Sequence, residues 1–205
     1  QASVRAWSGT DPLGDVEPEN PFTTVKLTPI TGDENERYFT AYNTNDEVFT
    51  TALTADYVKV TGTMPCALWE DGWYNLSTLL KSSQKLKTLD LSATTATTMS
   101  INSLFQSQSV VTIIMPATLT SITESNFSLC PNLKVVDLSL CTSVPYVDYH
   151  AFKDNGGIMV DRLVTVYVAP GKKIEFSNYR LEGGGSNYPW ATLENENRIE
   201  IVEKE

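Results

Sequence analysis

Histidine-based catalysis has a single candidate residue in this sequence. His150 is the only histidine, and Ser–His–Asp catalysis would require it to lie beside both a nucleophile and an orienting carboxylate. It aligns instead with Ser125, just before an aromatic residue in each of two similar segments. We expect an exposed polar side chain there, and a general base must reach its proton within hydrogen-bond distance. The sequence therefore predicts no histidine-based catalytic site.

Carboxylate pairs are numerous in an acidic chain, so Asp90 with Asp137 is weak evidence for glycoside hydrolysis. If their strands flank a third strand, two spacings of about 4.8 Å put them roughly 10 Å apart. Retaining glycosidases need about 5 Å between such carboxylates, and inverting ones up to about 9.5 Å. Glycoside hydrolysis is therefore geometrically marginal, and we expect no enzymatic activity.

Neither the cysteines nor the glycines form a metal-binding or phosphate-binding motif. Cys66, Cys130 and Cys141 are far apart and lack CxxC spacing, so a zinc site is not expected. The triglycine at 183–185 is not followed by the Gly-Lys-Ser/Thr of a phosphate-binding loop. We therefore expect no metal and no cofactor. We also expect three unpaired cysteines, because the predicted strands hold them too far apart for disulfides.

The composition limits the class of partner. The 205 residues carry 15 Lys and Arg against 25 Asp and Glu, a formal net charge of −10, whereas nucleic-acid binding needs clustered Lys and Arg. The 41% of hydrophobic residues suffices for a core. No apolar run approaches the roughly 20 residues that span a bilayer. Because the chain starts at Gln1, we expect that an export signal has already been removed.

The chain divides into an acidic beginning and a repetitive remainder, because residues 1–56 hold 10 acids and 3 bases. Residues 1–21 combine Gly, Pro and acids with little apolar periodicity, which favours an acidic arm or tether. Residues 22–56 favour a β-rich N-terminal cap. Within it, the alternation at 25–27 and the β-formers at 37–42 predict a hairpin.

The remainder repeats an apolar pattern. The form LxxLxL, typical of leucine-rich-repeat strands, recurs at offsets of 24, 23 and 30 residues, in the segments 86–92, 110–116, 133–139 and 163–169. Weaker copies are 58–62 and 198–202. A second column lies in phase with the strands and consists of Phe105, Phe127 and Phe152, with Leu80 in the comparable place. Two columns in phase predict stacked repeats, with Phe127 buried between neighbours and capped ends near 22–56 and Trp190.

Between residues 113 and 133 the chain resembles the BspA-like leucine-rich repeats of bacterial surface proteins. Their unit reads roughly L-x-x-I-x-L-P, T-S-I and A-F-x-x-C-x-x-L, and this chain has Ile113-Ile-Met-Pro116, Leu119-Thr-Ser-Ile122, Asn126-Phe127, Cys130 and Leu133. The resemblance covers about residues 57–205. It implies an α/β repeat fold, a right-handed leucine-rich-repeat solenoid. It also implies an exported, often lipid-anchored protein of Bacteroidetes that acts outside the cell or on the outer-membrane surface.

The alternation of the strands predicts which side chains face outward. The inward set is Val58/Val60, Leu89/Leu91, Ile113/Met115, Val136/Leu138 and Val166/Val168. The outward ladder is Lys59, Asp90, Ile114, Asp137 and Tyr167, flanked by Thr88, Thr112, Val135 and Thr165. A mixture of charged, aromatic and apolar residues suits protein contacts, although such cross-strand neighbours are also the ordinary means of stabilising a sheet.

Three functions remain open on these grounds. The first is a cell-surface or secreted adhesion module that binds a protein ligand. The second is carbohydrate binding through the aromatic residues Trp69, Trp73 and Tyr74, which could equally be buried in a cap. The third is a purely structural component of a surface layer. We expect the first, with no nucleic-acid partner and no transmembrane segment.

Overall fold

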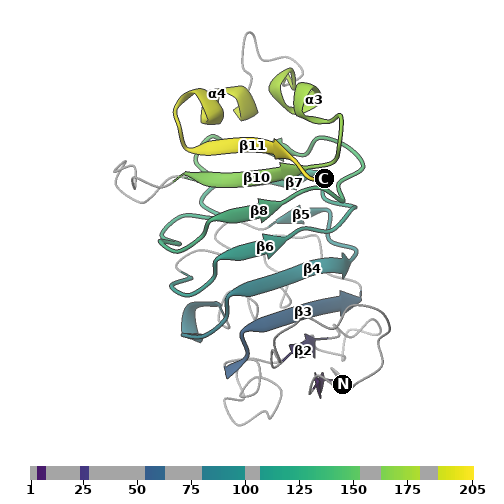
Figure 1. Ribbon diagram of the computed structural model, residues 1–205, viewed down its shortest axis with the longest axis vertical. Helices are drawn as coiled ribbons and strands as arrows, with labels where there is room; N and C mark the ends of the chain where they lie inside the picture. Colours follow the sequence, from purple (N-terminus) through teal and green to yellow (C-terminus); the bar gives the residue numbers. More distant parts are fainter. Residues whose placement is uncertain are drawn as a thin grey trace.

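The computed structural model describes residues 4–7, 24–27, 54–62, 80–99, 107–152, 163–180 and 189–205. These residues combine parallel β-sheet with short α-helices, which agrees with the α/β class (Figure 1). None of the described helices has both the length and the apolar character needed to cross a membrane.

A large sheet extends along the molecule (Figure 1). Its eight described strands lie in the order β1-β2-β3-β4-β6-β8-β10-β11, and all neighbours are parallel except β1 and β2. The strands are β1 (Val4–Trp7), β2 (Thr24–Leu27), β3 (Tyr57–Gly62), β4 (Thr88–Thr94), β6 (Thr112–Ile114), β8 (Val135–Asp137), β10 (Val164–Val168) and β11 (Ile199–Glu203). Strands β4, β6, β8 and β10 each begin within two residues of a predicted LxxLxL copy. The weaker copies form β3 and β11, so successive copies of the pattern become neighbouring strands.

A small sheet lies behind the large one in Figure 1. It consists of three described strands, all parallel and in the order β5-β7-β9: β5 (Thr98–Met99), β7 (Ser121–Ile122) and β9 (Tyr146–Val147). The Thr-Ser-Ile segment of the central copy forms β7. The sequence analysis does not predict this sheet, because a strand of two residues has no alternation to read.

Both sheets bury one face in the same core. Where their side chains are described, the inward residues predicted for the large sheet are buried: Val58, Leu89, Leu91, Ile113, Met115, Val136, Leu138, Val166 and Val168. The small sheet contributes Met99, Ile122 and Val147. Val60 and Phe105 lie outside the residues whose side chains are described.

The aromatic column lies inside this core. Phe127 has no exposed surface, and the centre of its ring lies 4.8 Å from that of Phe152 in the next copy. The prediction that Phe127 is buried between successive copies is therefore confirmed. Leu80, predicted for the comparable place, is also buried.

Leu163 departs from the pattern. It occupies the first place of the fourth copy and is 52% exposed, whereas Val110 and Leu133 in the same place are buried. The offset to Leu163 is 30 residues rather than 23 or 24. The additional residues come directly before Leu163, so only the positions from Val164 onward keep the pattern.

Threonine hydroxyls link successive copies along the small sheet and its flanking turns. Each donates a hydrogen bond to a backbone carbonyl 22 to 25 residues earlier, which is the spacing of the copies. These bonds, here called the threonine ladder, join Thr118 to Ala96, Thr120 to Thr97, Thr123 to Met99 and Thr142 to Ala117. These four hydroxyls therefore bond to backbone carbonyls of the preceding copy.

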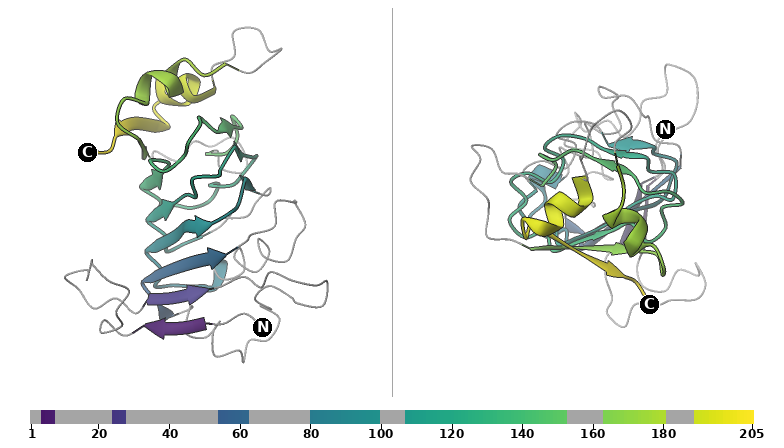
Figure 2. Two further views of the ribbon diagram at one scale, coloured as in Figure 1. Left: turned by 90° about the vertical axis from the view of Figure 1, so that its right-hand side faces the viewer. Right: turned by 90° about the horizontal axis from the view of Figure 1, so that it is seen from above.

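Two short helices, α3 (Lys173–Ser177) and α4 (Pro189–Asn195), cover the C-terminal end of the core (Figures 1 and 2). Trp190 of α4 is fully buried, and its indole Nε1 donates to the Pro145 carbonyl at 2.8 Å. Glu194 Oε1 accepts from the backbone N–H of Ile201 in the edge strand β11 at 3.2 Å. This bond occupies a donor through which an edge strand could otherwise pair with another chain. The C-terminal cap predicted near Trp190 is thus present.

The N-terminal residues join the large sheet. Strand β1 pairs antiparallel with β2, and β2 pairs parallel with β3. Residues 4–7 therefore form a strand although they belong to the predicted arm, because four residues are too few to reveal alternation. The predicted hairpin partner at 37–42 lies outside the described residues, and β2 pairs with β1 instead.

Candidate binding face

The large sheet has a face that points away from the core, here called the outer face. Its register aligns one row of Tyr57, Thr88, Thr112, Val135, Thr165 and Glu200. A second row is Lys59, Asp90, Ile114, Asp137, Tyr167 and Val202. The sheet thus brings together all nine residues of the predicted ladder and its flank. No described element lies over this face (Figure 2).

Asp90 on β4 is held by three groups. Its Oδ1 accepts from the backbone N–H of Ser92 at 2.8 Å, and its Oδ2 accepts from the Tyr57 hydroxyl and lies 3.2 Å from Lys59 Nζ. Burial alone would raise the pKa of Asp90, but the hydrogen bonds from Ser92 and Tyr57 and the positive charge of Lys59 outweigh it and lower the pKa. Burial and the neighbouring Asp90 raise the pKa of Tyr57.

Asp137 on β8 repeats this arrangement. Its Oδ1 accepts from the backbone N–H of Ser139 at 2.9 Å, and Lys204 Nζ donates to its Oδ2 at 2.6 Å. In each Asp-Leu-Ser copy the aspartate therefore closes a turn onto the serine N–H two residues later. In each copy a lysine from a different strand or its end neutralises the second oxygen.

Both aspartates are buried, with exposed fractions of 3% for Asp90 and 4% for Asp137. The expectation that the outward ladder presents their charge to a ligand is therefore wrong, because a lysine and a turn cover each carboxylate. Ile114 also stands between them in the row. The pair thus lacks the open carboxylates that glycoside hydrolysis requires.

The accessible part of the outer face combines apolar and polar side chains, with the exposed Glu200 at its β11 end. Ile114, Val135, Tyr167 and Val202 are half-buried, and together they are here called the apolar strip. Val135 lies diagonally between Ile114 and Tyr167 in the register, within reach of both side chains. The half-buried threonines Thr88, Thr112 and Thr165 border the strip along the neighbouring row.

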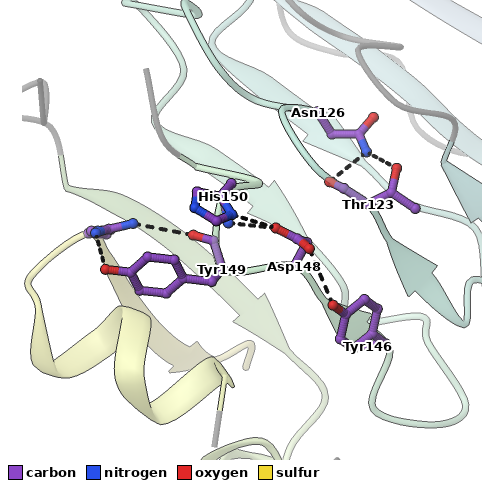
Figure 3. Close-up of polar contacts among 7 residues, drawn as sticks. Thr123, Asn126, Tyr146, Asp148, Tyr149 and His150 are labelled. Carbon is purple, nitrogen blue, oxygen red and sulfur yellow. Dashed lines mark hydrogen bonds and ion pairs between the residues drawn. The ribbon is translucent and has the colours of Figure 1, made fainter. Parts of the chain in front are cut away.

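A second polar group surrounds Asp148 beside β9 (Figure 3). Asp148 Oδ1 accepts from the His150 backbone N–H at 2.7 Å and lies 3.3 Å from His150 Nδ1, while the Tyr146 hydroxyl donates to Oδ2 at 3.3 Å. The Asp148 turn thus has the same form as those of Asp90 and Asp137. His150 is exposed, as predicted, and its imidazole lies against this turn aspartate.

Tyr149 connects this group to the C-terminal end (Figure 3). The guanidinium of Arg198 donates to the Tyr149 carbonyl at 3.2 Å and to its hydroxyl at 2.9 Å, and lies 4.5 Å from the ring centre. Glu196 accepts from the same hydroxyl and pairs with Arg198. Because these groups are engaged with one another, they fasten β11 to the Asp148 turn.

No protein-family model matches the chain, and no curated protein matches it. The BspA-like resemblance therefore stays a prediction. Trp69, Trp73 and Tyr74, predicted as an alternative sugar-binding group, lie outside the described residues. Within the described ranges, no cluster of three or more His, Cys, Asp or Glu side chains could hold a metal ion.

The sequence analysis does not predict the groups that hold the two aspartates. These groups are Tyr57, Lys204 and the backbone N–H groups of Ser92 and Ser139. The repeated Asp-Leu-Ser motif was a usable signal, because an aspartate two residues before a serine at a strand end favours a side-chain turn. Tyr57 could have been found by extending the threonine row one strand further. Lys204 carries no such signal, because it lies 67 residues from Asp137.

Proposed function

We propose that the chain is a leucine-rich-repeat solenoid of the BspA-like type that binds a protein ligand through the outer face of its large sheet, without enzymatic activity. The repeat architecture is supported by LxxLxL copies that lie on neighbouring parallel strands. It is also supported by the threonine ladder, whose bonds join residues 22 to 25 apart. Stacked units of this kind offer extended surfaces for binding.

The observation that carries the binding proposal is the apolar strip on an outer face that no described element covers (Figure 2). The interface centres of proteins are depleted of charge and enriched in aromatic and apolar residues. On this face the two carboxylates are neutralised within the chain, so Ile114 and Tyr167 are left as the side chains best suited to anchor a partner. Tyrosine is among the residues that most often dominate binding energy.

The proposed location is the cell surface, with export and a lipid anchor, and it rests on the resemblance alone. A direct test is the unprocessed N-terminal sequence. A lipobox cysteine immediately before Gln1 supports the lipid anchor, and its absence contradicts it.

The binding proposal can be tested with a panel of purified extracellular protein domains and a glycan array. We expect at least one protein to bind, and we expect Tyr167→Ala and Ile114→Ala to weaken its Kd by about tenfold or more, as truncating an anchor residue does. The matched control is Glu124→Ala, which removes an exposed side chain next to β7 of the small sheet. It should leave the Kd unchanged.

Two results would contradict the proposal. One is protein binding that Tyr167→Ala and Ile114→Ala leave intact while circular dichroism shows the fold retained. The other is binding to glycans alone, lost on Trp73→Ala, which would establish the carbohydrate-binding alternative instead.

A further inference from the structure

Exposed lysines gather at one edge of the outer face, in a chain whose net charge is −10. Lys85 and Lys87 come just before β4, and Lys134 comes just before β8. All three are exposed, and they are here called the lysine edge. Among the described acids nearby, Asp90 is already paired and Glu124 lies beside the small sheet. Asp56 is half-buried just before β3, where its carbonyl accepts from the Lys87 N–H at 2.8 Å.

The backbone fixes the spacing of two of these lysines. The Val111 N–H donates to the Lys87 carbonyl at 2.9 Å, and the Lys134 N–H donates to the Val111 carbonyl at 2.9 Å. Lys87 and Lys134 therefore stand two strand spacings apart, about 10 Å. Val111 stands between them and is half-buried.

The lysine edge differs from four other lysines that the structure describes. Lys59, Lys172, Lys173 and Lys204 each form an ion pair with a carboxylate. No described acid forms an ion pair with a member of the lysine edge. Its three exposed side chains lie beside the threonine row and the apolar strip.

We infer that the ligand of the outer face is an acidic segment of polypeptide that also carries apolar or aromatic side chains. This inference rests on the proposed function and names the chemistry of its partner. Complementary charge steers such a segment to the lysine edge and fixes its register. The apolar strip then buries its hydrophobic side chains.

The spacing defines the expected sequence of the segment. A chain in extended conformation advances about 3.3 Å per residue and alternates its side chains between two faces, so acids four residues apart share one face and lie about 13 Å apart. The long side chains of Lys87 and Lys134, whose backbones stand about 10 Å apart, can reach both of them. The row next to these lysines includes Thr112 and Val135, whose methyl groups suit apolar side chains between the acids. This apolar neighbourhood favours a polypeptide over a sulfated polysaccharide.

The test uses three fluorescent probes on the full chain: poly-L-glutamate, a random Glu–Tyr copolymer, and heparin. We expect the Glu–Tyr copolymer to bind most tightly, because it supplies both charge and aromatic rings. Binding should weaken between about 50 mM and about 200 mM salt, because exposed charges are screened.

The deciding variant is Lys87→Glu/Lys134→Glu, with Lys172→Glu/Lys173→Glu of the region around α3 as a control of identical charge change. We expect the first to weaken copolymer binding by about tenfold or more and the control by no more than about twofold. Equal effects of the two variants, or heparin binding more tightly than the copolymer, would overturn the inference.

The inference and the proposed function fail in different ways. If Tyr167→Ala leaves binding in the protein panel intact, the outer face is not the binding face, and the proposed function fails. If Tyr167→Ala abolishes that binding while the lysine-edge variant behaves as its control does, the face binds protein but the acidic partner is wrong.

Discussion

The two sheets use their outward side chains differently, although both bury their other face in one core. On the large sheet, side-chain contacts join outward residues to distant parts of the chain, as in the pairs Lys59–Asp90 and Lys204–Asp137, and the backbone bonds of the two aspartates stay within their own copy. Along the small sheet, the threonine ladder joins side chain to backbone of the preceding copy. Because the small sheet has strands of two residues, its backbone ladder is short, and hydroxyls supply further bonds.

This difference suggests a division of roles between the two sides. The strands of the large sheet satisfy most of their own backbone through parallel pairing, so outward side chains other than Asp90 and Asp137 can vary without loss of backbone hydrogen bonds. Along the small sheet, a change of side chain also removes a partner from a backbone carbonyl. We therefore expect substitutions to affect stability more on the small-sheet side and binding more on the outer face.

The largest effect should come from the core that both sheets share. Phe127→Ala leaves a cavity beside Phe152 and should lower the free energy of unfolding by about 3–5 kcal/mol. Chemical denaturation measures it, and Phe127→Leu should cost clearly less because it refills most of the volume. A melting temperature within a degree or two of the parent protein would show that the copies do not pack through Phe127.

The next effect concerns the buried charges of the large sheet. Asp90→Asn removes a carboxylate that accepts hydrogen bonds from Ser92 and Tyr57, and should destabilise the protein by about 2 kcal/mol at neutral pH.

The same variant should change the response to acid. Because the pKa of Asp90 is lowered in the folded chain, its contribution is complete above the unfolded pKa, near 4, and is lost as the pH falls through the lower folded value. Thermal melts from neutral pH to below pH 4 should therefore show a smaller loss for Asp90→Asn than for the parent. Glu124→Gln, which removes an exposed carboxyl, is the control. Parallel curves for Asp90→Asn and the parent would refute this role of Asp90.

A smaller effect is expected when a threonine is replaced by valine, once beside the small sheet and once on the outer face. This pair of variants tests the division of roles directly. Thr123→Val removes a hydroxyl that donates to the Met99 carbonyl at 2.7 Å and accepts from Asn126 Nδ2 at 2.9 Å (Figure 3). We expect a loss of about 1–2 kcal/mol by urea denaturation. Thr112→Val on the outer face should change stability by less than about 0.5 kcal/mol. If both variants cost the same, the division of roles is wrong.

The smallest effect on stability is expected for the cysteines, where reactivity is the readout. The two described cysteines, Cys130 and Cys141, are buried and form no disulfide, as predicted, whereas Cys66 lies outside the described residues. Burial, with the nearby charge of Asp137, raises the pKa of Cys141 to about 12. A thiol reagent at pH 8 should therefore spare Cys130 and Cys141 in the native protein. It should count three thiols after denaturation without reductant. A count of one would reveal an internal bridge.

Much of the large sheet could be predicted from residue types alone. The spacing of Leu89 and Leu91, repeated by Ile113 and Met115, fixed both the strands and the buried face, because a residue on a strand alternates sides with its neighbours. The small sheet could not be predicted, because strands such as Ser121–Ile122 are too short for periodicity to appear. The strand at Val4–Trp7 was missed for the same reason.

The same distinction between sequence and tertiary structure applies to the outer face. The sequence by itself determined which residues share the outer face, since alternation within β4, β6, β8 and β10 and the offsets between copies specify the rows. Only the tertiary structure decided that Asp90 and Asp137 are covered and that Lys87 and Lys134 are not paired with a described acid. Which lysine reaches which carboxylate depends on contacts between residues as distant as Asp137 and Lys204, 67 positions apart. Such contacts leave no periodic signal in the chain, because they are set by how separate strands lie beside one another in space.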